Sequence, residues 1–104
     1  MSEEIRIPEL QLLTIICDES LESHLSEEIL ESGAKGYSVT RVEGSGKSGT
    51  RDNLWDGENI KFEVVTTQEI VDKILNLLAK KYMDRYAMIA YHSQVRAMRP
   101  EHFI

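Results

Sequence analysis

The order and periodicity of the apolar residues predict an α+β fold, with two helices packed on one face of a four-stranded antiparallel sheet. Along the chain the expected elements follow one another as strand, helix, strand, strand, helix and strand. The expected strands are extended apolar or alternating segments, and the expected helices carry apolar residues spaced by three or four. This order is that of the ferredoxin-like βαββαβ arrangement. The 104 residues suit a single domain, 1–104.

The first strand is expected at residues 10–17, where both faces are apolar, as in a strand covered on two sides. Asp18-Glu19-Ser20 then interrupts the apolar run and supplies side chains that favour a helix start. Apolar residues spaced by four, from Leu21 to Ile29, form the buried stripe of the first helix. Gly33 can end that helix in a left-handed conformation.

The two middle strands, 37–42 and 60–65, flank a polar connection at 44–58 that contains four glycines. A connection of roughly 15 residues without periodicity is longer than compact domains usually need, and such loops are usually functional or disordered. We therefore expect a flexible loop at 44–58, held on two neighbouring strands, that senses a ligand or docks a partner.

The second half of the chain gives the remaining helix and strand. Thr66-Thr67-Gln68-Glu69 is predicted to open the helix as a capping box, and Lys80 and Lys81 in its last turn suit the helix dipole. The last strand is expected at 86–95, with Ala87, Ile89 and Tyr91 on one face; the tail from Arg96 has no clear period. Because the helices cover only one sheet face, we expect another copy of the chain to cover the second.

The bulk charge excludes some classes of partner. A net charge of −6 and a pI near 5.0 disfavour binding to nucleic acid or an anionic membrane through charge alone. No apolar run approaches the roughly 18 residues of a membrane span, so we expect no direct membrane insertion. The acidic start, Met1-Ser-Glu-Glu, is unlike a signal peptide, and the single cysteine, Cys17, excludes an internal disulfide. These features favour a cytoplasmic protein.

The polar loop holds the most distinctive candidate residues. Gly44-Ser-Gly-Lys-Ser48 imitates the end of a phosphate-binding P-loop, but Arg41 stands where the first glycine is required and no helix is expected to follow. Glycine amides with Lys47 and Arg51 can still surround an anion, the alternative being a solvated loop. Trp55, the only tryptophan, either anchors a partner or packs on its own subunit.

Other chemistries find less support in the sequence. Cys17, His24, His92 and His102 lack the spacing of metal ligands, and no catalytic triad stands out. A phosphatase of the acylphosphatase kind would need a phosphate cradle at the first strand-to-helix turn, which is acidic here. An RNA-recognition module would need stacking aromatics on its central strands, and residues 10–17 have none. A ligand-gated signalling module, with a mobile loop and clefts between subunits, fits better.

Three segments resemble the PII-like signalling proteins, in particular the branch associated with bicarbonate transport and carboxysomes. They are Glu31-Ser-Gly-Ala-Lys-Gly-Tyr37, the glycine–serine loop, and Asn59-Ile-Lys-Phe-Glu63. Lys80-Lys-Tyr82 and Asp84-Arg-Tyr-Ala87 are similar to that branch's short second loop. The resemblance covers roughly residues 10–95 and implies a homotrimer with its sheets turned inward.

The resemblance also implies a site. It places adenine nucleotides between subunits and makes 44–58 the loop called the T-loop. Arg51, with Lys47, would meet the phosphates. The residues that would line the adenine pocket are Gly36, Tyr37, Ser38, Ala87, Met88 and Ile89.

Departures from the family pattern limit what carries over. The loop 44–58 has no tyrosine for modification, and the tail, including Arg96 and Arg99, has no cysteine for a redox switch. The second loop lacks the classical glycine-rich sequence, which makes AMP or ADP as plausible as ATP.

The resemblance therefore implies a non-enzymatic sensor of AMP, ADP, ATP or cyclic AMP, with or without bicarbonate. No cofactor would be tightly bound. The T-loop, with Trp55, would regulate a bicarbonate transporter, another membrane transporter or a different target. The alternative is a metal-binding or structural trimer of ferredoxin-like fold, and slow nucleotide hydrolysis ranks third.

Overall fold

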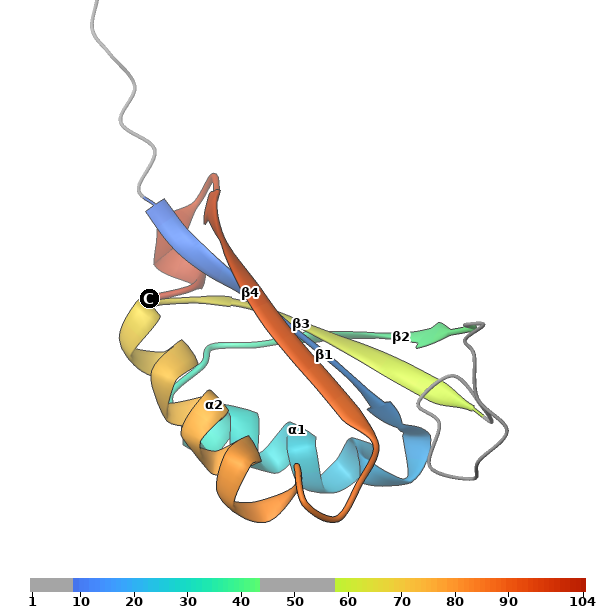
Figure 1. Ribbon diagram of the computed structural model, residues 1–104. Helices are drawn as coiled ribbons and strands as arrows, with labels where there is room; N and C mark the ends of the chain where they lie inside the picture. Colours follow the sequence, from blue (N-terminus) through green and yellow to red (C-terminus); the bar gives the residue numbers. More distant parts are fainter. Residues whose placement is uncertain (1–8, 44–57) are drawn as a thin grey trace, which may run out of the picture.

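The computed structural model describes residues 9–43 and 58–104, and it contains the predicted order of strands and helices (Figure 1). A short 3-10 turn precedes the first helix, and another follows the last strand. The elements are β1 (Glu9–Asp18), η1 (Glu19–Leu21), α1 (Glu22–Glu31), β2 (Ser38–Val42), β3 (Asn59–Thr66), α2 (Gln68–Lys81), β4 (Met88–Arg96) and η2 (Pro100–His102).

The sheet confirms the predicted fold class. Its four strands are antiparallel in the order β2-β3-β1-β4, so β2 and β4 form the two edges. Both helices pack on the same face of this sheet (Figure 1). The predicted flexible loop falls almost wholly on residues 44–57, which lie outside the described part of the chain.

The core lies between the helices and the sheet face that they cover. On β1 every second side chain faces this layer, so Leu13, Ile15 and Cys17 are fully buried there. The fully buried side chains that meet them from the other elements are Leu25, Phe62, Val64, Val71 and Leu78. The stripe predicted for the first helix is confirmed, because Leu21, Leu25 and Ile29 are all buried.

The helix ends follow local chemistry, with one correction. Asp18 Oδ2 accepts a hydrogen bond of 2.8 Å from Ser20 N and so caps the first turn. Gly33 follows α1 with φ of 110°, as predicted. The predicted capping box at the second helix begins one residue too early: Thr67, not Thr66, is the N-cap, and its hydroxyl accepts from Ile70 N at 3.4 Å. Thr66 pairs with Gln11 and so stays in the sheet ladder.

The face of the sheet away from the helices is apolar at its centre. Leu10 and Ile16 on β1 are only 3% and 8% exposed, and Tyr91 on β4 is 53% exposed. Part of this face is covered by the C-terminal segment after β4, which folds back over β1 and β3. No helix within residues 9–43 and 58–104 is long and apolar enough to cross a membrane.

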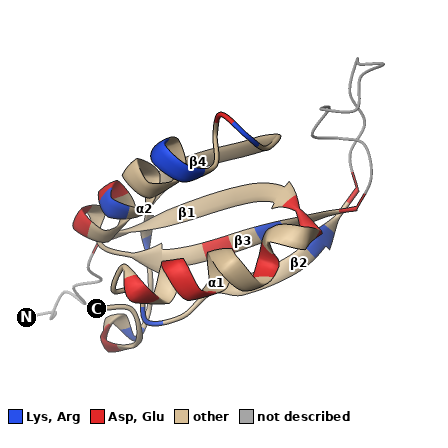
Figure 2. Ribbon diagram, turned by 90° about the horizontal axis from the view of Figure 1, so that it is seen from below, with Lys and Arg blue, Asp and Glu red and all other residues tan. Residues whose placement is uncertain are grey.

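Charge is distributed unevenly over the helix layer (Figure 2). Acidic residues are spread along α1, whereas Lys80 and Lys81 form a basic end of α2. One ion pair joins the two helices: Lys81 Nζ lies 3.1 Å from Glu28 Oε1. It holds the last turn of α2 against α1.

Candidate functional site

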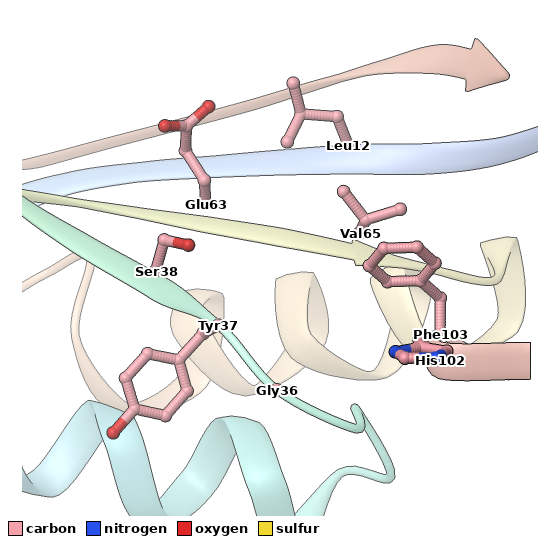
Figure 3. A pocket seen from close by; sticks show the side chains of 8 residues that line it. All are labelled: Leu12, Gly36, Tyr37, Ser38, Glu63, Val65, His102 and Phe103. Atoms are coloured by element: carbon pink, nitrogen blue, oxygen red, sulfur yellow. The ribbon is translucent and has the colours of Figure 1, made fainter. Parts of the chain in front are cut away.

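A cavity of about 440 Å³ lies on the sheet face opposite the helices (Figure 3). Strands β1 and β3 supply its floor, the segment leading into β2 supplies one wall, and the C-terminal segment supplies the other. The lining residues are Leu12, Gly36, Tyr37, Ser38, Glu63, Val65, His102 and Phe103. Residues from four separate parts of the sequence therefore meet at one place.

The strand register explains the floor of the cavity. Leu12 on β1 is paired with Val65 on β3, so their side chains stand side by side on the same face. Glu63 lies two residues earlier on β3, on that same face, and is paired with Ser38 on β2. The alternation along β3 thus sends Phe62 and Val64 into the core and leaves Glu63 and Val65 for the cavity.

The wall formed by residues 36–38 offers main chain more than side chain. The ring of Tyr37 points away from the cavity (Figure 3) and packs on the buried ring of Phe62, with 5.6 Å between ring centroids. Gly36 has no φ in the left-handed region, and a Cβ added to it would meet no atom within 4 Å. Packing within the described residues therefore does not require a glycine there, and the missing side chain leaves room for another molecule to approach the main chain.

The second wall depends on a tight reversal after β4. Arg99 is the one non-glycine residue with positive φ, 56°, in the described part of the chain. His102 N donates to Arg99 O at 3.0 Å, and Phe103 N donates to Pro100 O at 2.9 Å. This turn places His102 and Phe103 over the cavity. Neither residue was predicted from the sequence to line a pocket, because no periodic pattern in the tail indicates the reversal at Arg99.

The electrostatics of the cavity fit the uncharged part of a ligand. The Tyr37 phenol points away, so the ionisable groups that face the cavity are the Glu63 carboxylate and the His102 imidazole, and no lysine or arginine of the described residues belongs to the lining. Lys61 Nζ lies 3.9 Å from Glu63 Oε1 and offsets part of that negative charge. An anionic group of a bound molecule would have to find its cations outside this lining.

The other predicted pocket residues lie at the far edge of the sheet. Met88 points into the core and is 8% exposed, whereas Ile89 is half-buried on the opposite face. Three strand spacings of about 4.8 Å separate β2 from β4, so Ser38 and Ile89 are at least about 14 Å apart. One chain therefore does not bring residues 36–38 and 87–89 together. The predicted phosphate contacts, Lys47 and Arg51, and the predicted anchor, Trp55, lie outside the described residues.

An ion-pair cluster stands where β2 ends and β3 begins, beside a cavity of about 370 Å³. Arg41 Nη1 contacts the Glu19 carboxylate and lies 3.0 Å from Glu58 Oε2. Hydrogen bonding with Glu58, and then with Arg41, lowers the pKa of Glu19. The cluster ties η1 to the two ends of the connection 44–57.

Residues 9–43 and 58–104 contain neither a metal-binding site nor a reactive thiol. No group of three or more histidine, cysteine, aspartate or glutamate side chains there is arranged to hold a metal ion. Cys17 is buried, and burial together with the charge of Asp18 raises the pKa of its thiol to about 12. Such a thiol stays protonated at neutral pH and is a poor nucleophile.

Comparison with known proteins places this geometry in a family. The family described as nitrogen regulatory protein P-II matches residues 10–102. A protein described as a PII-like signalling protein from Thermus thermophilus is 37% identical, covering 96% of this chain and 100% of its own, with a TM-score of 0.82.

Two more distant structures share the fold. CPII from Thiomonas intermedia, solved with ADP and bicarbonate, is 20% identical with a TM-score of 0.82, covering 97% of this chain and 100% of its own. Bacillus subtilis GlnK, solved with ATP, is 16% identical with a TM-score of 0.64, covering 84% of each chain. The match over residues 10–102 and the 37% identity show that this chain belongs to the P-II family of nitrogen regulatory proteins.

Proposed function

We propose that the protein is a non-enzymatic, cytoplasmic sensor that binds an adenine nucleotide in the cavity beside residues 36–38. The observation that carries this proposal is the combination of a P-II fold with a cavity that has an apolar floor, formed by Leu12 and Val65, and a wall of main chain at residues 36–38. A flat purine suits such a site, because apolar side chains cover its faces and main-chain groups meet its polar edge. The ligands solved with CPII and GlnK, ADP and ATP, belong to this class.

The working unit in this proposal is a homotrimer. The sheet face away from the helices carries the exposed Tyr91 on β4 and the partly exposed Leu12 on β1, and this favours contact with another copy. The two groups of predicted pocket residues lie at opposite edges of the sheet, so the β4 edge of one copy can complete the site at the β2 edge of the next. Each site would then contain residues 36–38 of one subunit and residues 87–89 of another.

Phosphate binding is assigned to Lys47 and Arg51. The described lining of the cavity has no lysine or arginine, so the charge of the phosphates must be met from outside it. The connection that carries both residues begins and ends beside the Arg41 cluster at the end of β2. Nucleotide binding would select one conformation of this T-loop, and the loop, with Trp55, would then bind or release a membrane transporter or another target.

Calorimetric titration with AMP, ADP, ATP and cyclic AMP, each with and without bicarbonate, tests the proposal. We expect saturable binding at about one site per chain, on a protein that light scattering shows to be trimeric. Phosphate release should stay at the background rate over the same period, as expected for a sensor. If a trimeric preparation gives no binding heat with any of the four nucleotides, the proposed function is refuted while the family assignment stands.

A further inference from the structure

We infer that the ring of Phe103 is the surface on which the base of the bound nucleotide stacks, which makes the C-terminal turn part of the binding site. This inference rests on the proposed function and assigns a role to a residue that the strands and the T-loop leave out. Phe103 lines the cavity from the side opposite residues 36–38. Its ring lies beside Val65, on the side of the cavity where His102 also stands (Figure 3).

The choice of Phe103 follows from comparing the three ring-bearing residues of the lining. Tyr37 turns its ring away from the cavity and packs it against Phe62, so that ring is not available to a molecule in the cavity. His102 is mostly exposed, and its Nε2 lies 3.9 Å from a carboxylate oxygen of Glu101. Phe103 is half-buried and directs its ring toward the apolar floor. Among these rings, Phe103 is the one that is both half-buried and directed toward the apolar floor, which makes it the best placed to stack on a base.

The floor supplies the second surface that a stacked base needs. Leu12 and Val65 are paired across β1 and β3, so their methyl groups form one continuous apolar strip beneath the cavity. A purine that lies over this strip and stacks on the Phe103 ring would have much of its apolar surface removed from water. Its polar edge would then lie near the main chain of Gly36 and the hydroxyl of Ser38.

The turn that carries Phe103 is locally fixed. Arg99 adopts a left-handed conformation that a residue with a side chain avoids, and Pro100 restricts the next φ. Two main-chain hydrogen bonds, of 3.0 and 2.9 Å, close the turn at His102 and Phe103. A side chain held in place before binding loses little freedom when the ligand arrives, so its contacts contribute more fully to affinity.

Replacing the ring tests this assignment by titration calorimetry. Phe103→Ala should weaken AMP, ADP and ATP by the same factor, about tenfold or more, because the ring acts on the base that the three share. Phe103→Leu, which keeps apolar area but not the ring, should lose less. Ile104→Ala is the matched control, since Ile104 is the next residue, 60% exposed and outside the lining; it should bind like the unchanged protein.

A fluorescence experiment separates stacking from a merely structural role. In the Trp55→Phe background, Phe103→Trp places the only tryptophan of the chain at the cavity, and AMP should quench its emission by stacking. Ile104→Trp in the same background should show no quenching. This readout decides the question even if Phe103→Ala loses stability.

Each remaining outcome has a defined meaning. If the unchanged protein binds nucleotide and Phe103→Ala binds it equally well or more tightly, the inference is overturned and the proposed function stands. A loss that grows with the number of phosphates would also overturn it, because that pattern reports charge rather than stacking. If the unchanged protein binds no nucleotide, the proposed function fails first and the inference fails with it.

Discussion

Alanine substitutions at two glycines, Gly36 and Gly33, should change the stability of the protein in opposite directions. Gly36 has no positive φ, and a Cβ there would meet nothing within 4 Å. Gly36→Ala should therefore raise the free energy of unfolding by about 0.4–1 kcal/mol, because alanine restricts the unfolded chain. Gly33 has φ of 110°, and its added Cβ would lie 3.3 Å from Ile70 Cδ1. Gly33→Ala should lower the free energy of unfolding by about 1–2 kcal/mol.

Urea denaturation at one fixed protein concentration measures both changes, since an oligomer's stability depends on concentration. The same Gly36→Ala protein should bind AMP and ADP at least about tenfold more weakly, because its new methyl group occupies the wall where the ligand's edge must approach. Higher stability with lower affinity is the signature of a residue kept for binding rather than for folding. If Gly36→Ala is destabilised as much as Gly33→Ala, contacts with another copy of the chain must require the glycine, and its assignment to ligand binding is refuted.

Three further changes test other features. Thr66→Val should raise the free energy of unfolding by up to about 1 kcal/mol, because Thr66 Oγ1 is buried without a hydrogen-bond partner. Thr67→Ala should lower the free energy of unfolding by about 0.5–1 kcal/mol, because the helix loses its cap. Urea midpoints equal to that of the unchanged protein would contradict both predictions. Arg41→Gln should raise the pKa of Glu19 toward its ordinary value, as followed by NMR. A lowered carboxyl pKa adds stability above the ordinary pKa, and this stability is lost as the pH falls through the pKa of the folded state. The unchanged protein should therefore be more stable than Arg41→Gln at neutral pH but not in acid. A stability difference that persists in acid would refute this prediction. Cys17, whose pKa is raised to about 12, should react with iodoacetamide at neutral pH only in denaturant, and mass spectrometry of the native protein should find no adduct.

The sequence predicted most of the architecture because each element carries a local signal. Leu21, Leu25 and Ile29 can share a buried stripe only in a helix, and the alternation at 60–65 can separate core from solvent only in a strand. The second helix start was misplaced by one residue because two adjacent threonines can both cap. The ladder decides between them: Thr66 pairs with Gln11 and so cannot leave the sheet.

The site was less predictable, for a physical reason. The family resemblance predicts residues 36–38 as pocket residues, and they line the cavity, but Leu12, Glu63 and Val65 join them only through strand register. His102 and Phe103 join through a chain reversal that depends on a strained Arg99 conformation. Neither register over long sequence separations nor a left-handed arginine leaves a periodic pattern, so a sequence without a structure does not reveal them.

The separation of residues 36–38 from residues 87–89 on opposite sheet edges has a consequence for how a ligand would act on assembly. A molecule held by both edges would bridge two copies that meet head to tail, and contacts of that kind form a ring when the rotation between copies closes, as in the proposed homotrimer. Binding of the ligand then strengthens the association of the subunits, and subunit association strengthens ligand binding by the same factor, because the two equilibria are linked. Dilution would lower the apparent affinity for the ligand, and saturating ligand would hold the ring together at protein concentrations where it otherwise dissociates.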